Sequence, residues 1–214
     1  MSIGRPRKIE PEVVLQRAVE LFWRYGYEAT SMADLVKATG LHKGSLYQLY
    51  GSKKQLFIAA LNLYIQDVYE SVQRIERETT DPAMAYHEIM LMIINRLETN
   101  DCQGCMVSNT LNGNTLKDRD IQQILSSSMQ TYIDRMASIL ERIPVETPLT
   151  LILPASEAAQ LIMMLMIGMG EHLQINKDKQ QIRTALALQL NCLIPGFDDY
   201  LYHQSMVADT AVTG

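Results

Sequence analysis

Apolar residues recur along this chain with the 3.6-residue period of an α-helix, and runs that alternate apolar and polar residues are lacking. The pattern predicts helices over residues 11–26, 31–38, 42–49, 53–78, 82–99, from 105, 117–143, 155–173 and 179–193. In the first helix, the residues expected on the inner face are Val13, Val14, Ala18, Leu21 and Phe22. We therefore predict an all-α fold of about nine helices without a sheet.

Charge is distributed unevenly along the chain. The net charge of the 214 residues is −5, but residues 1–54 carry nine Lys and Arg against five Asp and Glu, a net of +4. Residues 55–214 carry ten against nineteen, a net of −9. A basic surface attracts polyanions and an acidic one repels them. We expect a basic domain of residues 1–54 that binds a polyanion and an acidic domain of residues 55–214 with another task.

The two short helices predicted on either side of Gly40 have the size of a helix-turn-helix. Gly40 suits the turn because glycine tolerates a positive φ, and Ser31 is placed to cap the first helix. The second helix begins with the His-Lys-Gly-Ser segment at residues 42–45. Short polar and basic residues at this end of a recognition helix reach base edges, and Gly44 would let the backbone approach DNA closely. The pattern predicts that the basic domain of residues 1–54, called the head below, binds DNA.

The head also resembles a known family. The run from Ala29 to Tyr47, the Gly-Ser-Lys-Lys-Gln-Leu run at 51–56 and the upstream Ala18–Phe22 segment resemble the DNA-binding segment of TetR-family transcriptional regulators. The resemblance covers residues 10–57. It implies a homodimer that binds a palindromic operator in double-stranded DNA, usually as a repressor. It also implies that a small-molecule effector in the C-terminal domain causes release, and that the last two helices of each subunit form a four-helix bundle in the dimer.

Tyr47, Tyr50, Lys53 and Lys54 carry hydroxyl and ammonium groups that suit phosphate contacts. Within the family pattern, His42, Gln48 and Tyr50 are departures that bear on base preference. The basic segment before the first helix either inserts Arg5 and Arg7 into the minor groove or is a solvated tail that speeds association. The residues expected to contact DNA are Arg5, Arg7, Ser31, His42, Lys43, Gly44, Ser45, Tyr47, Gln48, Tyr50, Lys53 and Lys54.

The helix predicted over 155–173 is the most apolar one and contains four of the thirteen methionines. Methionine adapts to varied apolar ligands, but it also fills cores and dimer interfaces. We expect this helix at the dimer interface, with an effector pocket between it and the two preceding long helices. The residues considered for the pocket or for a sensor are Met92, Arg96, Cys105, Met129, Met136, Met164, Met169 and His172.

The Cys-Gln-Gly-Cys run at 102–105 is the most chemically suggestive feature outside the head. Cys105 follows Gly104 at the predicted start of a helix, where the helix dipole stabilises a thiolate. The Gly104–Asn109 segment also resembles a Gly-Cys turn of a TetR subgroup, some members of which respond to electrophiles or oxidants. Packing as a small buried residue, thiol sensing and metal binding remain as alternatives. A closed zinc site would need four ligands, and no second ligand pair has a recognisable spacing.

Together these features predict a DNA-binding transcriptional regulator rather than an enzyme, because no nucleophile–base arrangement or phosphate-binding glycine loop is recognisable. We expect no cofactor, no metal and no membrane span, since the longest apolar stretch covers ten residues and a span needs about 20. Three cysteines and no secretory signal point to the cytoplasm. A helical adaptor that binds protein and a helical enzyme are the rival classes.

Overall fold

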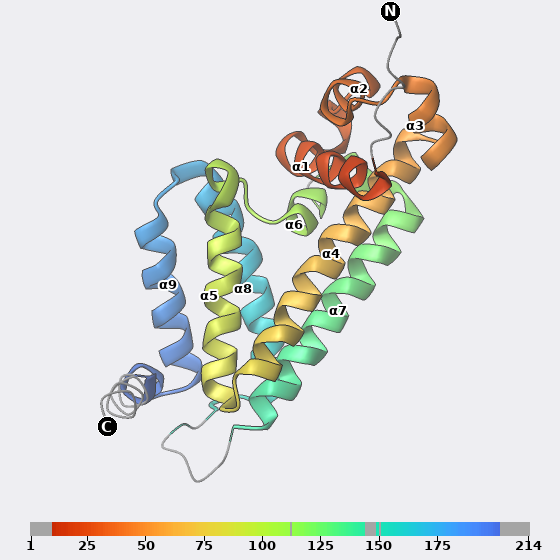
Figure 1. Cartoon of the computed structure of the whole chain (residues 1–214). Helices are drawn as coiled ribbons and strands as arrows, with labels where there is room; N and C mark the ends of the chain where they lie inside the picture. Colours follow the sequence, from red (N-terminus) through yellow and green to blue (C-terminus); the bar gives the residue numbers. More distant parts are fainter. Residues whose placement is uncertain (1–9, 112, 144–148, 150, 202–214) are drawn as a thin grey trace, which may run out of the picture. The chain divides into compact units, whose positions relative to one another are not determined.

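The computed structural model describes residues 10–111, 113–143, 149 and 151–201, and these form nine α-helices, one 3₁₀-helix and no strand (Figure 1). The helices are α1 (Pro11–Ala29), α2 (Met32–Thr39), α3 (Lys43–Tyr50), α4 (Lys53–Glu78), α5 (Pro82–Cys102), α6 (Met106–Leu111), η1 (Asn114–Lys117), α7 (Arg119–Glu141), α8 (Ala155–Asn176) and α9 (Lys179–Leu193). Residues 197–201 are also helical. The predicted all-α fold is confirmed.

The predicted bounds of α4 and α9 agree with the structure, and α2 and α3 each begin and end one residue later than predicted. Four other helices differ by more. The first helix continues past Gly26 to Ala29, and Gly26, with φ 74° and ψ 172°, makes a kink instead of an end. The helices α5 and α8 each run three residues further than predicted, to Cys102 and Asn176. The predicted helix over 117–143 is η1 followed by α7, because Asp118 leaves the helical conformation, with ψ 119°.

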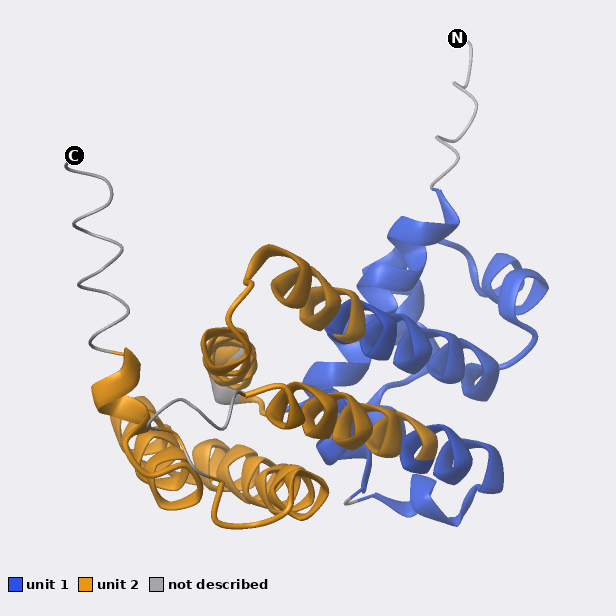
Figure 2. Cartoon of the chain, turned by 90° about the horizontal axis from the view of Figure 1, so that it is seen from below, with its two compact units in different colours: residues 1–68, 105–126 blue, residues 69–104, 127–214 orange. Residues whose placement is uncertain are grey.

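The chain divides into two compact units, coloured separately in Figure 2. Unit 1 comprises residues 1–68 and 105–126, and unit 2 comprises residues 69–104 and 127–214. The predicted boundary between residues 54 and 55 separates two functions, DNA binding and effector binding. The division into compact units does not test this boundary. The compact unit that contains the helix-turn-helix is larger than residues 1–54, since it includes the start of α4, α6, η1 and the start of α7.

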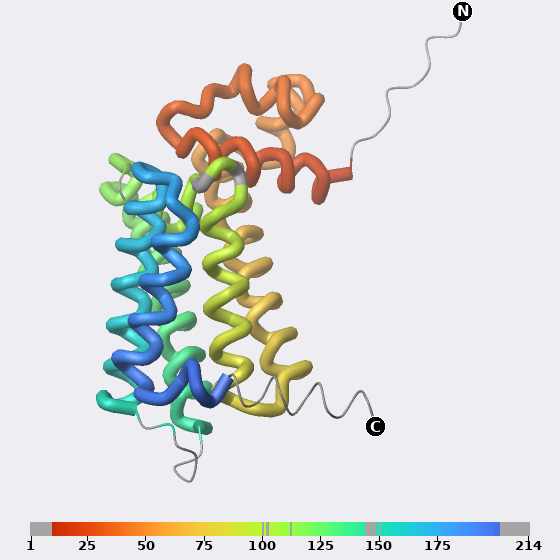
Figure 3. The backbone as a smooth tube through the Cα atoms, turned by 90° about the vertical axis from the view of Figure 1, so that its left-hand side faces the viewer, coloured from red at the N-terminus to blue at the C-terminus, as the bar shows by residue number. Residues whose placement is uncertain are grey.

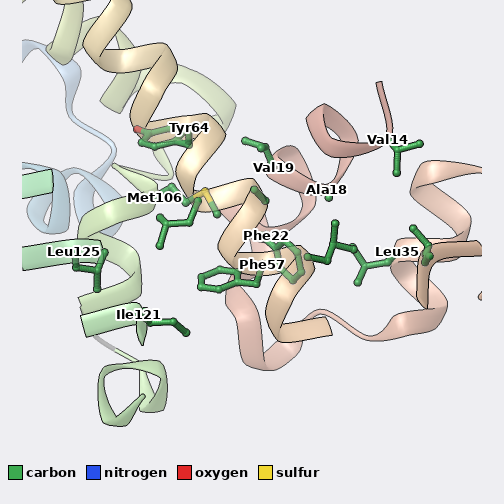
Figure 4. Close-up of a cluster of buried hydrophobic side chains, with 14 residues drawn as sticks. Val14, Ala18, Val19, Phe22, Leu35, Phe57, Tyr64, Met106, Ile121 and Leu125 are labelled. Atoms are coloured by element: carbon green, nitrogen blue, oxygen red, sulfur yellow. The ribbon is translucent and has the colours of Figure 1, made fainter. Parts of the chain in front are cut away.

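A shared apolar core holds unit 1 together (Figure 4). Phe22 of α1 meets Phe57 of α4 edge to face, with ring centroids 5.0 Å apart. On α1 the buried positions Val14, Ala18 and Phe22 are spaced four residues apart, which is one helical face. The prediction that Val13 lies on this face is wrong: it is 44% exposed, because it is one position off the i, i+4 row. The core residues outside α1 are Leu35, Leu46, Leu56, Phe57, Ala60, Leu61, Tyr64, Met106, Ile121 and Leu125.

Unit 2 contains α5, α8 and α9, which run alongside one another in Figure 3 and contact each other pairwise. Gly170 of α8 faces Leu97 of α5, since an added Cβ would meet a Leu97 methyl at 3.4 Å. Three ion pairs, made by two largely buried carboxylates, tie its helices together. Glu76 pairs with Arg135 and with Arg142, the latter at 2.7 Å, and Glu98 pairs with Arg183 at 2.8 Å.

One helix in the described part of the chain, α8, is long and apolar enough to cross a membrane by length and composition, with a mean hydropathy of 1.2 over its best window. A core helix meets the same criterion, and 39% of this window is buried within the chain.

Candidate nucleic-acid interface

Ser31 and Asp34 hold the first turn of α2 in a reciprocal capping box. The Ser31 hydroxyl accepts from the Asp34 backbone N–H at 3.1 Å, and the Asp34 carboxylate accepts from the Ser31 backbone N–H at 2.9 Å. The Ser31 hydroxyl also donates to this carboxylate at 2.6 Å, and these bonds lower the pKa of Asp34 below its ordinary value. The sequence predicts Ser31 both as a cap and as a DNA contact; its hydroxyl is engaged in the cap.

The turn between α2 and α3 has the geometry that its residues favour. Gly40 adopts φ 73° and ψ 7°, the left-handed conformation, and its N–H donates to the Val36 carbonyl. Arg17 of α1 donates to the Thr39 carbonyl at 3.2 Å, which ties the end of α2 to α1. The turn therefore sets the direction in which α3 leaves α2, as the sequence predicts for a helix-turn-helix.

The recognition helix α3 buries one residue and exposes its polar side. Leu46 is buried in the core of unit 1, whereas Ser45 is half-buried. Lys43 lies over the ring of Tyr47, one turn further on, with the ammonium 5.9 Å from the ring centroid. The predicted DNA contacts that α3 and its N-cap expose to solvent are His42, Lys43, Gly44, Tyr47 and Gln48.

Gly44 is the informative residue of this surface. A Cβ added at Gly44 would meet no atom of the protein within 4 Å, and its φ is not in the left-handed range. The fold of the single chain therefore gives no reason for glycine at this position. A missing side chain on an exposed helix start instead lets another molecule approach the backbone closely.

Three of the predicted phosphate contacts also have partners inside unit 1. The Tyr50 hydroxyl donates to the Pro11 carbonyl at 3.3 Å, and burial raises the pKa of this phenol. The Lys53 ammonium lies 4.3 Å from the centre of the Tyr27 ring. The Lys54 ammonium lies between two carboxylates, which no sequence pattern indicated. Arg5 and Arg7 lie outside the described residues.

Cys105 lies in unit 1, against the core that the helix-turn-helix shares, and it is partly buried. The Tyr64 hydroxyl donates to the Cys105 Sγ at 3.5 Å. The Cys105 carbonyl accepts from the Asn109 N–H in α6, so Cys105 lies at the start of this helix. The predicted position at a helix start is confirmed. Within the described part of the chain, no three His, Cys, Asp or Glu side chains are grouped as metal ligands would be.

The other residues considered for an effector pocket lie in unit 2 and differ in burial. Met136 is fully buried, and Met92, Arg96, Met129 and Met169 are half-buried. Met164 is 59% exposed and does not line the interior of the single chain. His172 is exposed, with Nε2 3.0 Å from Gln181 Oε1 and 2.9 Å from Asn176 Nδ2. Their role stays a prediction.

Unit 2 also buries polar atoms that the sequence pattern did not single out. Tyr86 of α5 is fully buried, and burial together with the nearby Tyr132 phenol raises the pKa of Tyr86. Among the described residues, the hydroxyl of Tyr86 and one carboxylate oxygen of Glu171 are buried without a hydrogen-bond partner. Such groups are costly to bury and mark places where a ligand or water can bind. Tyr86 lies within an apolar helix face. The hydrophobic periodicity of the sequence therefore predicts that Tyr86 is buried, but not that its hydroxyl lacks a partner.

Comparisons with known proteins agree with the arrangement of unit 1. The sequence model of the family described as "Bacterial regulatory proteins, tetR family" matches residues 14–60, which include α2 and α3. The HTH-type transcriptional repressor BdcR of Escherichia coli (strain K12) is 32% identical over 136 residues, 63% of this chain and 69% of BdcR. This chain belongs to the TetR family. The TetR-family relatives are transcriptional regulators and not enzymes.

Another TetR-family relative, the HTH-type transcriptional repressor ComR of E. coli K12, is 36% identical over 135 residues. The match covers 57% of this chain, which spans 63% of the length of ComR. A solved structure of the TetR-family regulator CifR, a cysteine mutant complexed with 26-base-pair operator DNA, covers 89% of this chain and all of the CifR chain. Its TM-score is 0.76 at 22% identity, which shows that the TetR-family fold extends over both units.

Proposed function

We propose that this chain is a transcriptional repressor that binds a palindromic operator in double-stranded DNA. The observation that carries the proposal is the exposed start of α3, where Gly44 has no structural reason within the chain and is flanked by His42 and Lys43. A recognition helix reads base edges with this end in the major groove. The names of ComR and BdcR as repressors, and the operator DNA bound to CifR, support the same function.

The proposed regulator acts as a homodimer that pairs through α8 and α9. Both helices expose large apolar side chains in the single chain, and such exposed apolar faces mark interaction surfaces. These residues are Leu161, Met164, Leu165, Ile175 and Leu188. Two recognition helices in a symmetric dimer would read half-sites about 34–36 Å apart, hence a palindrome.

The proposed effector binds in unit 2 and shifts the dimer toward a state that does not match the operator. A ligand moves such an equilibrium only by its difference in affinity for the two states. The methionines of α5, α7 and α8 suit an apolar ligand, and the buried hydroxyl of Tyr86 suits a ligand that also carries one hydrogen-bonding group. We also propose that this regulator has no catalytic activity and acts in the cytoplasm.

A DNA-binding assay with the region flanking the protein's own gene tests the proposal. Replacing Gly44 with Ala should weaken operator binding about tenfold or more, since a lost or blocked base contact costs about 1–3 kcal/mol. The same change should leave thermal stability equal or slightly higher, because alanine favours the helix and the added Cβ meets no protein atom. Gel retardation at two salt concentrations and a melting curve measure both effects.

Retardation by the wild-type protein that weakens steeply with salt is the expected pattern for phosphate contacts. Absence of retardation at low salt would reject the repressor proposal and favour the protein-binding adaptor. An unchanged affinity of the Gly44→Ala variant would remove α3 as the reading element.

Thiol modification at Cys105 is a second proposed stimulus, supported by the position of this side chain against the core that carries the helix-turn-helix. Adding a bulky group to a packed thiol displaces its neighbours, Tyr64 among them. Cys105→Ser should abolish release of the operator by N-ethylmaleimide, and Cys192→Ser, at an exposed thiol, is the matched control. If the Cys105→Ser variant is still released, Cys105 has only a packing role.

A further inference from the structure

The first turn of α4 carries two adjacent lysines, Lys53 and Lys54, whose surroundings differ. The Lys54 ammonium lies 2.7 Å from Asp118 Oδ2 and 2.8 Å from Asp120 Oδ2, so it contacts two carboxylates at once. Both belong to residues 105–126, which share unit 1 with the start of α4. Hydrogen bonds to these carboxylates raise the pKa of Lys54, and the bond from Lys54 lowers the pKa of Asp118.

Asp118 has a second role that fixes its carboxylate in place. Its Oδ1 accepts from the backbone N–H of Asp120 at 3.1 Å and of Ile121 at 3.4 Å, and so caps the start of α7. Oδ2 remains for Lys54. One carboxylate thus links the first turn of α7 to the first turn of α4, beside the buried Ile121.

The position of Lys54 in the helix explains why it needs such partners. A positive charge in the first turn is unfavourable because the helix dipole is positive at this end. Either acidic side chains or a DNA phosphate can compensate this charge. For Lys54 the two carboxylates already do so, and a phosphate would have to displace them and be repelled by them. Lys53 instead lies over the Tyr27 ring, which carries no formal charge at neutral pH.

We infer that Lys54 is a positioning residue for DNA reading and does not contact the DNA backbone. The cluster of Lys54, Asp118 and Asp120 holds the first turn of α4 on residues 105–126, and this turn begins three residues after α3 ends. Lys53 is the residue of the pair that contacts phosphate. The inference rests on the proposed function, since it concerns how the operator is held.

Operator binding measured by fluorescence anisotropy over a range of salt concentrations distinguishes the two lysines. Each lost phosphate contact should reduce the slope of log K against log salt by about 0.9, so Lys53→Gln should reduce it by about two in a dimer. Lys54→Gln should keep the wild-type slope and lower affinity about three- to fivefold per protomer, the size of a well-formed surface ion pair. A reduced slope for Lys54→Gln would overturn the inference.

The acidic partners provide the matched test. Asp118→Asn with Asp120→Asn should weaken binding as Lys54→Gln does, and the triple variant should be no weaker, because all three residues act as one cluster. Asparagine at position 118 can still cap α7. If freeing Lys54 from its carboxylates raises affinity instead, Lys54 is a phosphate contact that the carboxylates restrain, and the inference is wrong.

A readout without DNA separates this inference from the proposed function. Trp23 is the single tryptophan and contacts Tyr64 in unit 1, so its fluorescence follows unfolding of this unit. A double-mutant cycle of Lys54→Gln with Asp118→Asn and Asp120→Asn should show favourable coupling in urea unfolding. Zero coupling would overturn the positioning role even if DNA binds, whereas failure of the wild type to bind DNA would reject the repressor proposal alone.

Discussion

Replacing Phe22 with Ala is expected to lower the free energy of unfolding of unit 1 by about 3–5 kcal/mol and to abolish operator binding. Phe22 is 1% exposed and its ring meets Phe57 edge to face and Tyr27 in a stacked arrangement. Replacing the ring by a methyl group removes buried apolar surface and the ring contacts, and it leaves a cavity between α1 and α4. Urea unfolding followed by the fluorescence of Trp23, next to Phe22 in sequence, measures the loss.

Val13→Ala on the same helix is the matched control, since Val13 is 44% exposed. Its effect on unfolding should stay within about 0.5 kcal/mol, as for other exposed positions. An equal loss in the two variants would mean that the core of unit 1 is not built on the face of α1 that contains Val14, Ala18 and Phe22.

Leu125→Ala is expected to lower the free energy of unfolding of unit 1 by about 2–5 kcal/mol and to weaken operator binding. Leu125 lies in α7, 75 residues beyond the end of α3 in sequence, but it is 1% exposed within the core that holds Leu35 and Leu46 of the helix-turn-helix (Figure 4). Trp23 fluorescence in urea and anisotropy with operator DNA measure the two effects. The result would show that residues 105–126 stabilise the DNA-reading unit.

The neighbouring Ser126→Ala serves as the control for α7, because Ser126 is exposed and lies off the buried face. It should change neither the unfolding midpoint nor DNA affinity. If Leu125→Ala leaves the urea unfolding midpoint followed by Trp23 fluorescence unchanged, this part of α7 does not contribute to the stability of unit 1. The core that supports the helix-turn-helix would then not depend on α7.

Much of the candidate interface could be predicted from short stretches of sequence, because the interactions that build it are local. The capping box joins residues three apart, and the left-handed turn requires only Gly40. The burial of Leu46 follows from helical periodicity. The partner of Lys54 could not be predicted in this way, since Asp118 and Asp120 are 64 and 66 residues away and acidic residues are common along the chain.

The sequence by itself determined that the chain is helical, where α4 and α9 begin and end, and that residues 31–50 form a helix-turn-helix with a polar recognition helix. These features depend on periodicity, caps and turn residues, which act within a few positions. Only the tertiary structure decided that residues 105–126 complete the core of the DNA-reading unit, that Cys105 lies there, and that Lys54 already has two carboxylate partners. A periodic pattern shows which face of a helix is buried, but the partner of that face depends on how distant helices pack.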